Sequence, residues 1–473
     1  AATFGVTYSI TSASKEVKDN SSNLVKLDNP SVNTPVLNSS ESDYEFDFRD
    51  LVKDDCRSSV SGKIRCLIDR ENKWIRLLDA SNGSINGTNV KFANLISLCG
   101  ESYTITSIAP NAFKNVTTLT GTIEFPSSLK SVGDYAFSGC NKITGSIILP
   151  TTVTYIGDYA FDGCNQITGL TIPSSVKYIG SCAFKDCSSI ANRVVIPNEI
   201  TEILPSTFQG CSKLTEVTFS NKLTKIGQNA FNNCVKLANI LLPDSLVEID
   251  NYAFNSCTSL TKVDISNHLT RIGSYSFQSC AGLTDVNVAD SVELIDKYAF
   301  NDCRNLTNVN INEETSNLTK IGDYAFCYAS KLKMINFPKK LEFIGEQAFY
   351  GDTAFVGTPK IPESVTEIGY NAFELTGCDK KAGDLEVAYS YEGEGYAKWL
   401  LVASFAQEWT NFAIEKNTIG IAGGAFRGYM GTGQLTLGGT DNRTLKYICD
   451  SAFALNYWSS IAGLEYTQIK TIG

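Results

Sequence analysis

The chain has 473 residues, with 40 Lys and Arg against 50 Asp and Glu, and therefore carries a net charge of −10. Its 43% hydrophobic content excludes a disordered acidic chain and is enough for a sizeable core. The acidic balance argues against nucleic-acid binding, and no apolar run reaches the roughly 18–20 residues of a membrane span. The single histidine, His268, argues strongly against a His-centred triad or a multi-His metal site.

The first hundred residues differ in composition from the rest. Residues 1–45 are rich in Ser, Asn, Thr and Asp, which predicts a flexible leader or the extended edge of a cap. Residues 46–101 are predicted to form a small β-rich N-terminal cap that covers the end of the following domain. No charged n-region or apolar h-region follows Ala1, so no signal peptide is expected in this chain, and a mature form and a protein that never had one are equally compatible with this.

A repeat of 23–24 residues extends over residues 102–378. From Phe113 to Phe373, a phenylalanine that usually follows Ala recurs at steps of 24, 24, 23, 24, 23, 23, 23, 23, 26, 23 and 24 residues. Ile or Val lies five residues before each Phe from Phe137 onward. Cys lies three residues after each Phe from Phe137 to Phe300, namely at Cys140, Cys164, Cys187, Cys211, Cys234, Cys257, Cys280 and Cys303.

The repeat from Cys234 to Cys257 shows how each unit should fold. Leu237, Ile240 and Leu242 form a short alternating strand that Pro243 ends, and a second short apolar segment follows. The spacing of the Ala-Phe pair and the next Cys predicts one tight helical turn. Because one repeat cannot bury these side chains alone, the repeats should stack in register as a β-rich solenoid with a parallel β-ladder.

This pattern resembles the BspA-type (Treponema-type) leucine-rich repeat, whose motif is L-x-x-I-x-I-P-x-x-V-x-x-I-G-x-x-A-F-x-x-C. Residues 167–187, ITGLTIPSSVKYIGSCAFKDC, match it almost letter for letter, and the resemblance extends from about residue 102 to residue 473. The resemblance implies a leucine-rich repeat fold. It also implies a cell-surface or secreted adhesin-like protein that binds host proteins, extracellular-matrix proteins or other cells.

The array is interrupted near its end. Residues 379–415 contain two β-rich runs around a Gly-rich turn, which predicts an inserted β-hairpin, and residues 416–473 return to the repeat. The stretch Lys398–Ser404 resembles Lys73–Ser81, and both are interpreted as caps or braces over a sheet edge. The chain stops at the Ile-Gly that precedes Ala-Phe elsewhere. This favours a natural protein that continues, and a decayed last repeat with a disordered tail is the alternative.

The regular cysteines are predicted to be buried thiols. Neighbouring coils are about 4.8 Å apart with parallel Cβ vectors, whereas a disulfide needs Cβ atoms about 3.8 Å apart and turned towards each other. The thiols should therefore act as small apolar groups and weak donors. Cys56 and Cys66 lie outside the array, and a bridge between them is as compatible with the sequence as two free thiols.

No residues with a catalytic pattern are found. G-x-S-x-G, H-E-x-x-H and Walker A sequences are absent, and we predict no catalytic, metal-binding or cofactor-binding residues and no cofactor. Glu392 and Glu394 flank a glycine, but a solvated hairpin turn explains them better than paired catalytic acids. An enzyme with its site in residues 374–425 is therefore an unfavoured alternative.

The candidate functional residues lie on the outside of the predicted strands. In each strand, the residue between the last two apolar positions points away from the core. This first outward row consists of Glu124, Ile148, Thr171, Val195, Thr218, Leu241, Asp264, Asn287, Asn310, Asn336 and Lys360. Its residues from Ile148 to Asn336 are the candidate protein-binding face. The Asp-Asn-Asn-Asn part is equally compatible with an amide ladder that only stabilises the stack.

A second outward row lies just before each Ile-Gly. It consists of Tyr155, Tyr178, Glu202, Lys225, Glu248, Arg271, Leu294, Lys320, Phe343 and Glu367. Tyr155 and Tyr178 join the candidate face because they are neighbours in the stack and aromatic residues are enriched at interfaces. Ordinary sheet-surface tyrosines are the alternative interpretation.

The sequence thus predicts a non-enzymatic surface or secreted protein whose partner is a protein, with no nucleic acid and no membrane span in this chain. An intracellular or structural protein-interaction scaffold is the alternative, since reduced thiols are compatible with it. The ligand and the oligomeric state do not follow from the repeat, because the motif residues belong to the core.

Overall fold

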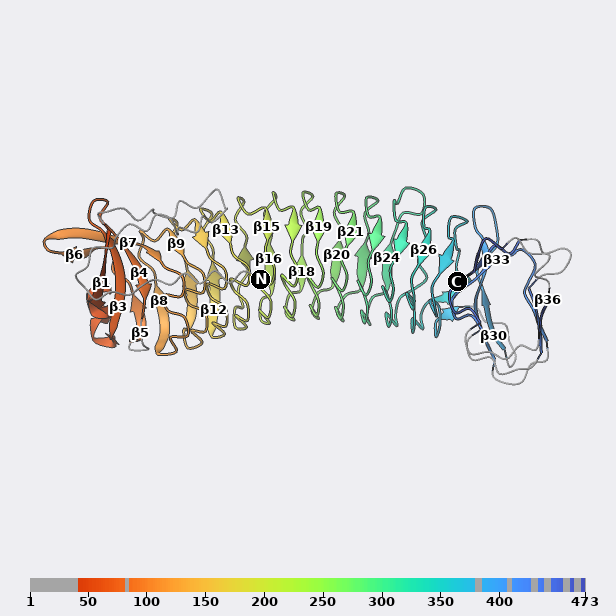
Figure 1. The fold of residues 1–473 in the computed structure, drawn as a ribbon, viewed down its shortest axis with the longest axis horizontal. Coiled ribbons are helices and arrows are strands. Elements are labelled where there is room, and N and C mark those ends of the chain that lie inside the picture. Colours follow the sequence, from red (N-terminus) through yellow and green to blue (C-terminus); the bar gives the residue numbers. More distant parts are fainter. Residues whose placement is uncertain are drawn as a thin grey trace. The chain divides into compact units, whose positions relative to one another are not determined.

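The structure is a computed structural model that describes residues 41–80, 85–378, 385–405, 411–426, 433–437, 444–453, 460–462 and 469–472. Residues 1–40, most of the predicted leader, lie outside the described residues. The chain divides into two compact units, Ala1–Ile200 and Thr201–Gly473, and each of them is a solenoid of parallel coils over its repeats (Figure 1).

The first unit opens with a β-rich cap. Its elements are β1 (Glu41–Asp47), η1 (Phe48–Leu51), η2 (Asp54–Ser59), β2 (Val60–Ser61), β3 (Lys63–Asp69), β4 (Trp74–Asp79), β5 (Asn86–Lys91), β6 (Ile96–Leu98) and β7 (Glu101–Ile108). Strand β1 begins within the range predicted for the leader and pairs antiparallel with β3. β3 pairs antiparallel with β4, and β4 runs parallel to β7. Within the cap, the antiparallel pairing of β1, β3 and β4 therefore gives way at β7 to the parallel pairing that the coils use.

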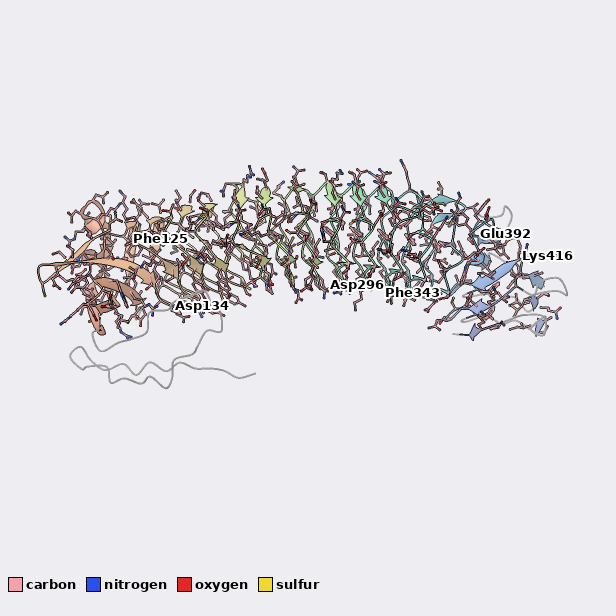
Figure 2. The ribbon with its side chains drawn as sticks, turned by 90° about the horizontal axis from the view of Figure 1, so that it is seen from above. Phe125, Asp134, Asp296, Phe343, Glu392 and Lys416 are labelled. Atoms are coloured by element: carbon pink, nitrogen blue, oxygen red, sulfur yellow. The ribbon has the colours of Figure 1, made fainter. Side chains whose placement is uncertain are left out.

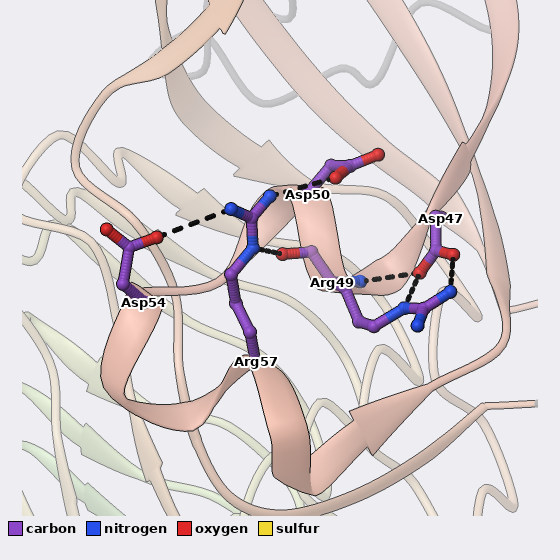
Figure 3. Close-up of polar contacts among 5 residues, drawn as sticks. All are labelled: Asp47, Arg49, Asp50, Asp54 and Arg57. Carbon is purple, nitrogen blue, oxygen red and sulfur yellow. Dashed lines mark hydrogen bonds and ion pairs between the residues drawn. The ribbon is translucent and has the colours of Figure 1, made fainter.

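Ion pairs surround the short helices of the cap (Figure 3). Asp47 caps η1, because its carboxylate accepts hydrogen bonds from the backbone N–H of Arg49 at 3.0 Å and from its Nε at 2.9 Å. These hydrogen bonds from Arg49 lower the pKa of Asp47 to about 2. Arg57 donates to the Arg49 carbonyl at 2.9 Å and pairs with Asp50 and Asp54. Since these side chains are exposed, the contacts orient the helices and add little stability.

Parallel coils follow in the first unit. Their strands are β8 (Leu119–Glu124), β9 (Ser131–Val132), β10 (Gly145–Ile148), β11 (Tyr155–Ile156), β12 (Ile167–Thr171), β13 (Tyr178–Ile179) and β14 (Val194–Val195). β7, β9, β11 and β13 form one ladder, and β10 and β12 pair in another. Ile156 lies beside Val132 on one side and Ile179 on the other, so equivalent apolar residues meet in the core as the repeat predicted.

The second unit is built from coils of the same kind. Its array strands are β15 (Glu202–Ile203), β16 (Glu216–Thr218), β17 (Lys225–Ile226), β18 (Asn239–Ile240), β19 (Glu248–Ile249), β20 (Lys262–Asp264), β21 (Arg271–Ile272), β22 (Asp285–Asn287), β23 (Leu294–Ile295), β24 (Asn308–Asn310), β25 (Lys320–Ile321), β26 (Phe343–Ile344), β27 (Val356–Gly357), β28 (Glu367–Ile368) and β29 (Gly377–Cys378). One parallel sheet contains eight of these strands, in the order β15, β17, β19, β21, β23, β25, β26 and β28. The strands β20, β22 and β24 form a separate sheet.

The hairpin predicted after the array is present. The remaining strands are β30 (Leu385–Tyr389), β31 (Lys398–Phe405), β32 (Asn411–Ala413), β33 (Thr418–Ile421), β34 (Gln434–Thr436), β35 (Tyr447–Ile448), β36 (Ser460–Ala462) and β37 (Thr471–Ile472). β31 pairs antiparallel with β30 and parallel with β33. β4, which carries Trp74, has the same two kinds of partner. The two Trp strands therefore occupy the same position, between an antiparallel hairpin and a parallel stack.

The helical turn expected at each Ala-Phe pair is not formed. Instead, two residues per coil have positive φ, as at Tyr252 and Ser256, both near 60°. Each interrupts a right-handed helix, because a residue with a side chain is disfavoured at positive φ. Phe254 consequently donates its backbone N–H to Ser276 in the next coil at 2.8 Å rather than within its own turn. The segment around each Ala-Phe pair is thus a series of turns that is hydrogen-bonded to the neighbouring coil.

The core is a column of stacked phenylalanines. In the second unit, the ring of Phe254 is 5.3 Å from that of Phe231 and 5.4 Å from that of Phe277, with interplanar angles of 5° and 8°. All three side chains are fully buried. Offset aromatic stacking adds to the burial energy, so this column is the main contact between successive coils.

A ladder of thiols runs beside the phenylalanines, as the sequence predicted. Cys257 donates its S–H to the carbonyl of Phe231 at 3.3 Å, and Cys280 donates to Phe254 at 3.2 Å. Cys303 donates to the carbonyl of Phe277 at 3.1 Å. All cysteines are free. Each thiol thus satisfies a buried carbonyl of the preceding coil, which is a reason beyond size for cysteine at this position.

Cys56 and Cys66 are both buried and no disulfide joins them, so the bridge that the sequence left open is not formed. The Sγ atom of Cys56, in η2, donates to the carbonyl of Lys53 at 3.3 Å and lies 3.6 Å from the carbonyl of Lys91 in β5. Cys66 lies in the middle of β3, between β1 and β4.

Alkylation of the native chain is expected to modify one cysteine rapidly, Cys99, which is exposed while the other cysteines are buried. Burial keeps the ladder thiols protonated and raises the pKa of Cys280 to about 12, and only the thiolate reacts. Mass spectrometry after denaturation without reductant should show adducts on all 15 cysteines. Fewer adducts after denaturation would reveal a disulfide, and rapid labelling of several cysteines in the native chain would contradict the buried ladder.

Candidate functional site

In the first unit, the first outward row presents aliphatic side chains to solvent. Ile148 at the end of β10 is 62% exposed, and Val195 in β14 is 51% exposed. Thr171 at the end of β12 is paired with Ile148 in the parallel register and is also exposed. The sequence-based prediction that these three side chains point outward is therefore correct, and they alternate between apolar and hydroxyl groups.

Tyr155 and Tyr178 lie in another sheet of the first unit. Their rings stack with centroids 5.0 Å apart and an interplanar angle of 6°. The Tyr155 hydroxyl donates to the Asp134 carboxylate at 3.2 Å, and the Tyr178 hydroxyl donates to Asp158 at 3.4 Å (Figure 2 labels Asp134). Burial raises the pKa of both tyrosines, that of Tyr178 to about 12. Because they belong to the ladder of β9, β11 and β13, they do not share a strand ladder with Ile148 and Thr171.

The Asp residues beneath these tyrosines also organise the backbone. Asp134 accepts a hydrogen bond from the N–H of Asp158 at 2.9 Å, and Asp158 accepts one from the N–H of Ser181 at 2.8 Å. Burial raises the pKa of Asp158. The tyrosine pair is thus held by a hydrogen-bonded framework, which agrees with the interpretation as ordinary sheet-surface tyrosines, and its binding role stays a prediction.

In the second unit, the first outward row changes character along the coils. Leu241 is 81% exposed, and Thr218 is half-buried at the end of β16. From Asp264 onward, the row is polar. The amide of Asn287 donates to the Asp264 carboxylate, and the amide of Asn310 donates to Asn287 at 2.6 Å. The amide ladder that the sequence allowed is therefore present from Asp264 to Asn310.

The ladder does not extend to Asn336. The repeat that contains Asn336 is preceded by the single 26-residue step, and no strand lies between β25 and β26 in this fully described stretch. A shallow cavity of about 180 Å³ opens there. It is lined by Thr307, Asn308, Val309, Asn310, Ile311, Lys333, Met334, Ile335 and Asn336. The exposed amide of Asn336 makes no hydrogen bond to any described residue.

The outward row ends at the hairpin. The Lys360 ammonium lies 5.6 Å from the centre of the Tyr391 ring and 5.5 Å from that of Tyr396. The two rings are 6.0 Å apart and nearly perpendicular. Tyr391 donates its backbone N–H to Pro359 at 2.7 Å, and the Tyr396 hydroxyl contacts Glu313. The structure thus places the rings of Tyr391 and Tyr396 next to the Lys360 side chain. The outward row predicted from the sequence did not include these two tyrosines.

A stripe of tyrosines in the second unit was also missed. Tyr252, Tyr275, Tyr298 and Tyr324 stack with successive centroid distances of 4.5, 4.6 and 4.6 Å. Each is half-buried and has a φ between 58° and 60°. The recurrence of Tyr two residues before the repeat Phe could have revealed the stripe. Its left-handed backbone could not be inferred, because Tyr has no intrinsic preference for it.

Pairs of side chains connect neighbouring coils in the second outward row. The Arg271 guanidinium donates to Asp296 through Nε at 3.1 Å, and the Lys320 ammonium lies 4.3 Å from the centre of the Phe343 ring (Figure 2). Burial opposes ionisation of Asp296, but the hydrogen bonds from Arg271, Lys297 and Ser274 together outweigh it and lower the pKa of that carboxyl. These contacts explain the row as a stabilising surface of the sheet.

The residues considered for chemistry are engaged in ordinary contacts. His268 lies on a turn with Nδ1 2.7 Å from the carbonyl of Asp244. Glu392, which is labelled in Figure 2, forms an ion pair with Lys398 at 3.6 Å and accepts a hydrogen bond from the Asn417 amide at 2.7 Å. Within the described ranges, no group of His, Cys, Asp and Glu is arranged to hold a metal ion. A search of the same residues finds no helix able to cross a bilayer.

Comparison with solved structures finds other leucine-rich repeat proteins. A leucine-rich repeat protein from Bacteroides ovatus is 26% identical, with 62% of this chain and 88% of that chain covered and a TM-score of 0.46. A leucine rich cell surface protein from Faecalibacterium prausnitzii is 18% identical, with 85% and 94% covered and a TM-score of 0.42. The pneumococcal vaccine antigen PcpA is 16% identical, with 86% and 98% covered and a TM-score of 0.42.

Comparison with curated protein sequences gives no match. The family model described as BspA type leucine rich repeat region (6 copies) matches residues 93–193, 144–261, 189–307 and 247–379. These overlapping matches span more than half of the chain, and they coincide with the coils that carry the stacked Phe, Ile and Cys residues. The chain therefore belongs to the BspA-type leucine-rich repeat family.

Proposed function

We propose that this chain is a non-enzymatic, adhesin-like protein of the cell surface or the extracellular medium. It binds host proteins, matrix proteins or other cells through its outward rows. The observation that carries the proposal is the exposure of aliphatic side chains on rigid strands, at 62% for Ile148, 51% for Val195 and 81% for Leu241. A rigid repeated surface binds a large partner with little loss of conformational entropy.

The family supports a binding role. It is a family of repeat scaffolds, and no enzyme family is indicated. The side chains that define the repeat are buried, so the family motif itself does not specify the partner. The outward rows are free to vary between coils, as the change from Leu241 to Asp264 illustrates, and they are the positions that would determine which protein is bound.

The test is binding of the purified chain to immobilised extracellular-matrix proteins and to intact host cells. Leu241→Asp is expected to weaken capture by about tenfold, because a charge replaces an exposed apolar contact. The matched control is Asn267→Asp, on an exposed turn of the same unit. Both variants should melt at the temperature of the parent chain. Absence of binding to every matrix protein and cell type would contradict the proposal.

The alternative is an intracellular or structural scaffold. Treatment of intact source cells with an external protease distinguishes the two. Degradation of the protein supports the surface location, whereas full protection in cells that contain the protein supports the scaffold.

A further inference from the structure

The first outward row of the second unit ends in a polar site of a different kind from the aliphatic positions. It is built from three consecutive coils, which contribute Asn310, Asn336 and Lys360, and from the segment between β30 and β31, which contributes Tyr391. We propose that this site, together with the shallow cavity beside it, binds an oligosaccharide that carries carboxylate groups. The proposal goes beyond the protein-binding role, and the aliphatic positions Ile148, Val195 and Leu241 take no part in it.

The cavity supplies unused hydrogen-bonding groups. It is about 180 Å³ and is lined on one side by Asn308 and Asn310 and on the other by Lys333 and Asn336. The Asn336 amide makes no hydrogen bond to a described residue, and the exposed Asn310 donates its amide N–H to Asn287. A side-chain amide offers donors and an acceptor in one plane, which suits vicinal sugar hydroxyls that both donate and accept.

The cavity has a structural cause. Elsewhere in this row, strands such as β22 and β24 pair closely, and their outward amides bond to each other. The repeat after β24 carries extra residues around Glu313, and the backbone from Leu332 to Phe337 forms no strand. Lys333 still donates its N–H to Thr307 at 3.1 Å, but no hydrogen bond joins the outward amides of Asn310 and Asn336. An amide ladder that only stabilised the stack would continue across this step.

Two ammonium groups favour an acidic ligand. Lys333 lines the cavity, and its charge helps to lower the pKa of Asp285. Lys360 lies in the next coil, beside the rings of Tyr391 and Tyr396. In a chain with a net charge of −10, ammonium groups on two successive coils favour a ligand with carboxylates. Steps of about 4.8 Å between coils place the groups from Asn310 to Lys360 along about 10 Å. The Tyr391 ring lies 5.6 Å from the Lys360 ammonium, so the site suits a short chain rather than one sugar.

The tyrosines complete the site. Tyr391 is 43% exposed beside the Lys360 ammonium, and Tyr396 is held behind it by its contact with Glu313. A tyrosine ring offers an apolar face for the C–H side of a sugar ring and a polar edge towards water. A protein partner is less well matched here, since protein hot spots fill apolar, fully desolvated pockets and this cavity is bordered mainly by polar groups.

Isothermal titration calorimetry of the full chain with trigalacturonate, maltotriose and triglutamate tests the proposal. Trigalacturonate is expected to bind with a Kd below about 1 mM, and maltotriose and triglutamate at least about tenfold more weakly. Asn336→Ala, Lys360→Met and Tyr391→Ala should each weaken trigalacturonate binding by about tenfold. Thermal melting checks that each variant is folded.

Matched controls are available on the same unit. Asn267→Ala, Lys236→Ala and Tyr328→Ala remove an exposed amide, ammonium and ring outside the site and should leave the Kd unchanged. Equal binding of triglutamate would show that the site recognises charge alone and would overturn the proposal. Equal binding of maltotriose, absence of trigalacturonate binding, or binding that survives all three site variants would also overturn it. None of these results bears on capture of matrix proteins, which depends on Leu241.

Discussion

Replacing Asp352 by Asn is expected to stabilise the chain at neutral pH. Asp352 lies three residues after Phe349, in the column that cysteines occupy in earlier coils, and is fully buried. Neither carboxylate oxygen has a hydrogen-bond partner among the described residues. Burial raises the pKa of Asp352 well above its ordinary value. A buried, unpartnered carboxylate is costly, so the folded chain holds this group as the neutral acid.

The sign of the pH dependence follows from proton binding. Above the unfolded pKa and below the folded one, the folded chain keeps the proton and the unfolded chain loses it. The free energy of unfolding therefore falls by about 1.4 kcal/mol per pH unit as the pH rises through this window. Asp352→Asn removes this loss. The free energies of unfolding of the variant and the parent should be similar at about pH 4. As the pH rises, that of the variant should become the larger of the two.

Urea unfolding at a series of pH values measures this difference. Other titrating groups contribute equally to both chains and cancel. Asp244→Asn, at an exposed position of the same unit, is the matched control for the loss of one carboxyl group. Asp352→Cys, which restores the column thiol, should behave like Asp352→Asn. A pH-independent difference for Asp352→Asn would show that the carboxyl finds a partner in the folded chain.

Replacing Phe277 by Ala is expected to destabilise the second unit by about 3–5 kcal/mol, the usual loss for a fully buried Phe. The ring is 5.4 Å from that of Phe254 and 5.3 Å from that of Phe300, and it is completely buried. Its removal leaves each neighbour with one stacking partner instead of two, because Phe254 still stacks on Phe231 and Phe300 on Phe326. Leu241→Ala, at a side chain that is 81% exposed, is the control and should change the free energy of unfolding by less than about 0.5 kcal/mol.

Hydrogen exchange locates the effect of Phe277→Ala. In a stack of coils, each repeat contacts only its neighbours, so amide protection should fall most in the coils of Phe254 and Phe300. Protection around Phe349 should change least. A uniform loss of protection throughout the second unit would mean that it unfolds as one cooperative block, and a loss of stability below about 1 kcal/mol would contradict the role of the stacked column.

The outward direction of the side chains in the first outward row could be predicted from the sequence. That Ile148, Leu241 and Asn310 point outward follows from strand alternation and from one repeat, and the structure agrees. The hydrogen bonds from Asn310 to Asn287 follow from stacking in register. The cavity beside Asn336 was not predicted, because it depends on how the backbone accommodates the extra residues after β24.

The amino-acid sequence by itself determined the repeat, the stacked Phe and Cys columns and the outward rows. The reason is that a 23–24-residue repeat can bury its apolar side chains only against an identical neighbour. Only the tertiary structure decided the left-handed turns at residues such as Tyr252, the placement of Tyr155 and Tyr178 in a separate sheet, the free thiols of Cys56 and Cys66, and the burial of Asp352. Each of these depends on contacts between coils or between distant strands, which outweigh the local preference of any single residue.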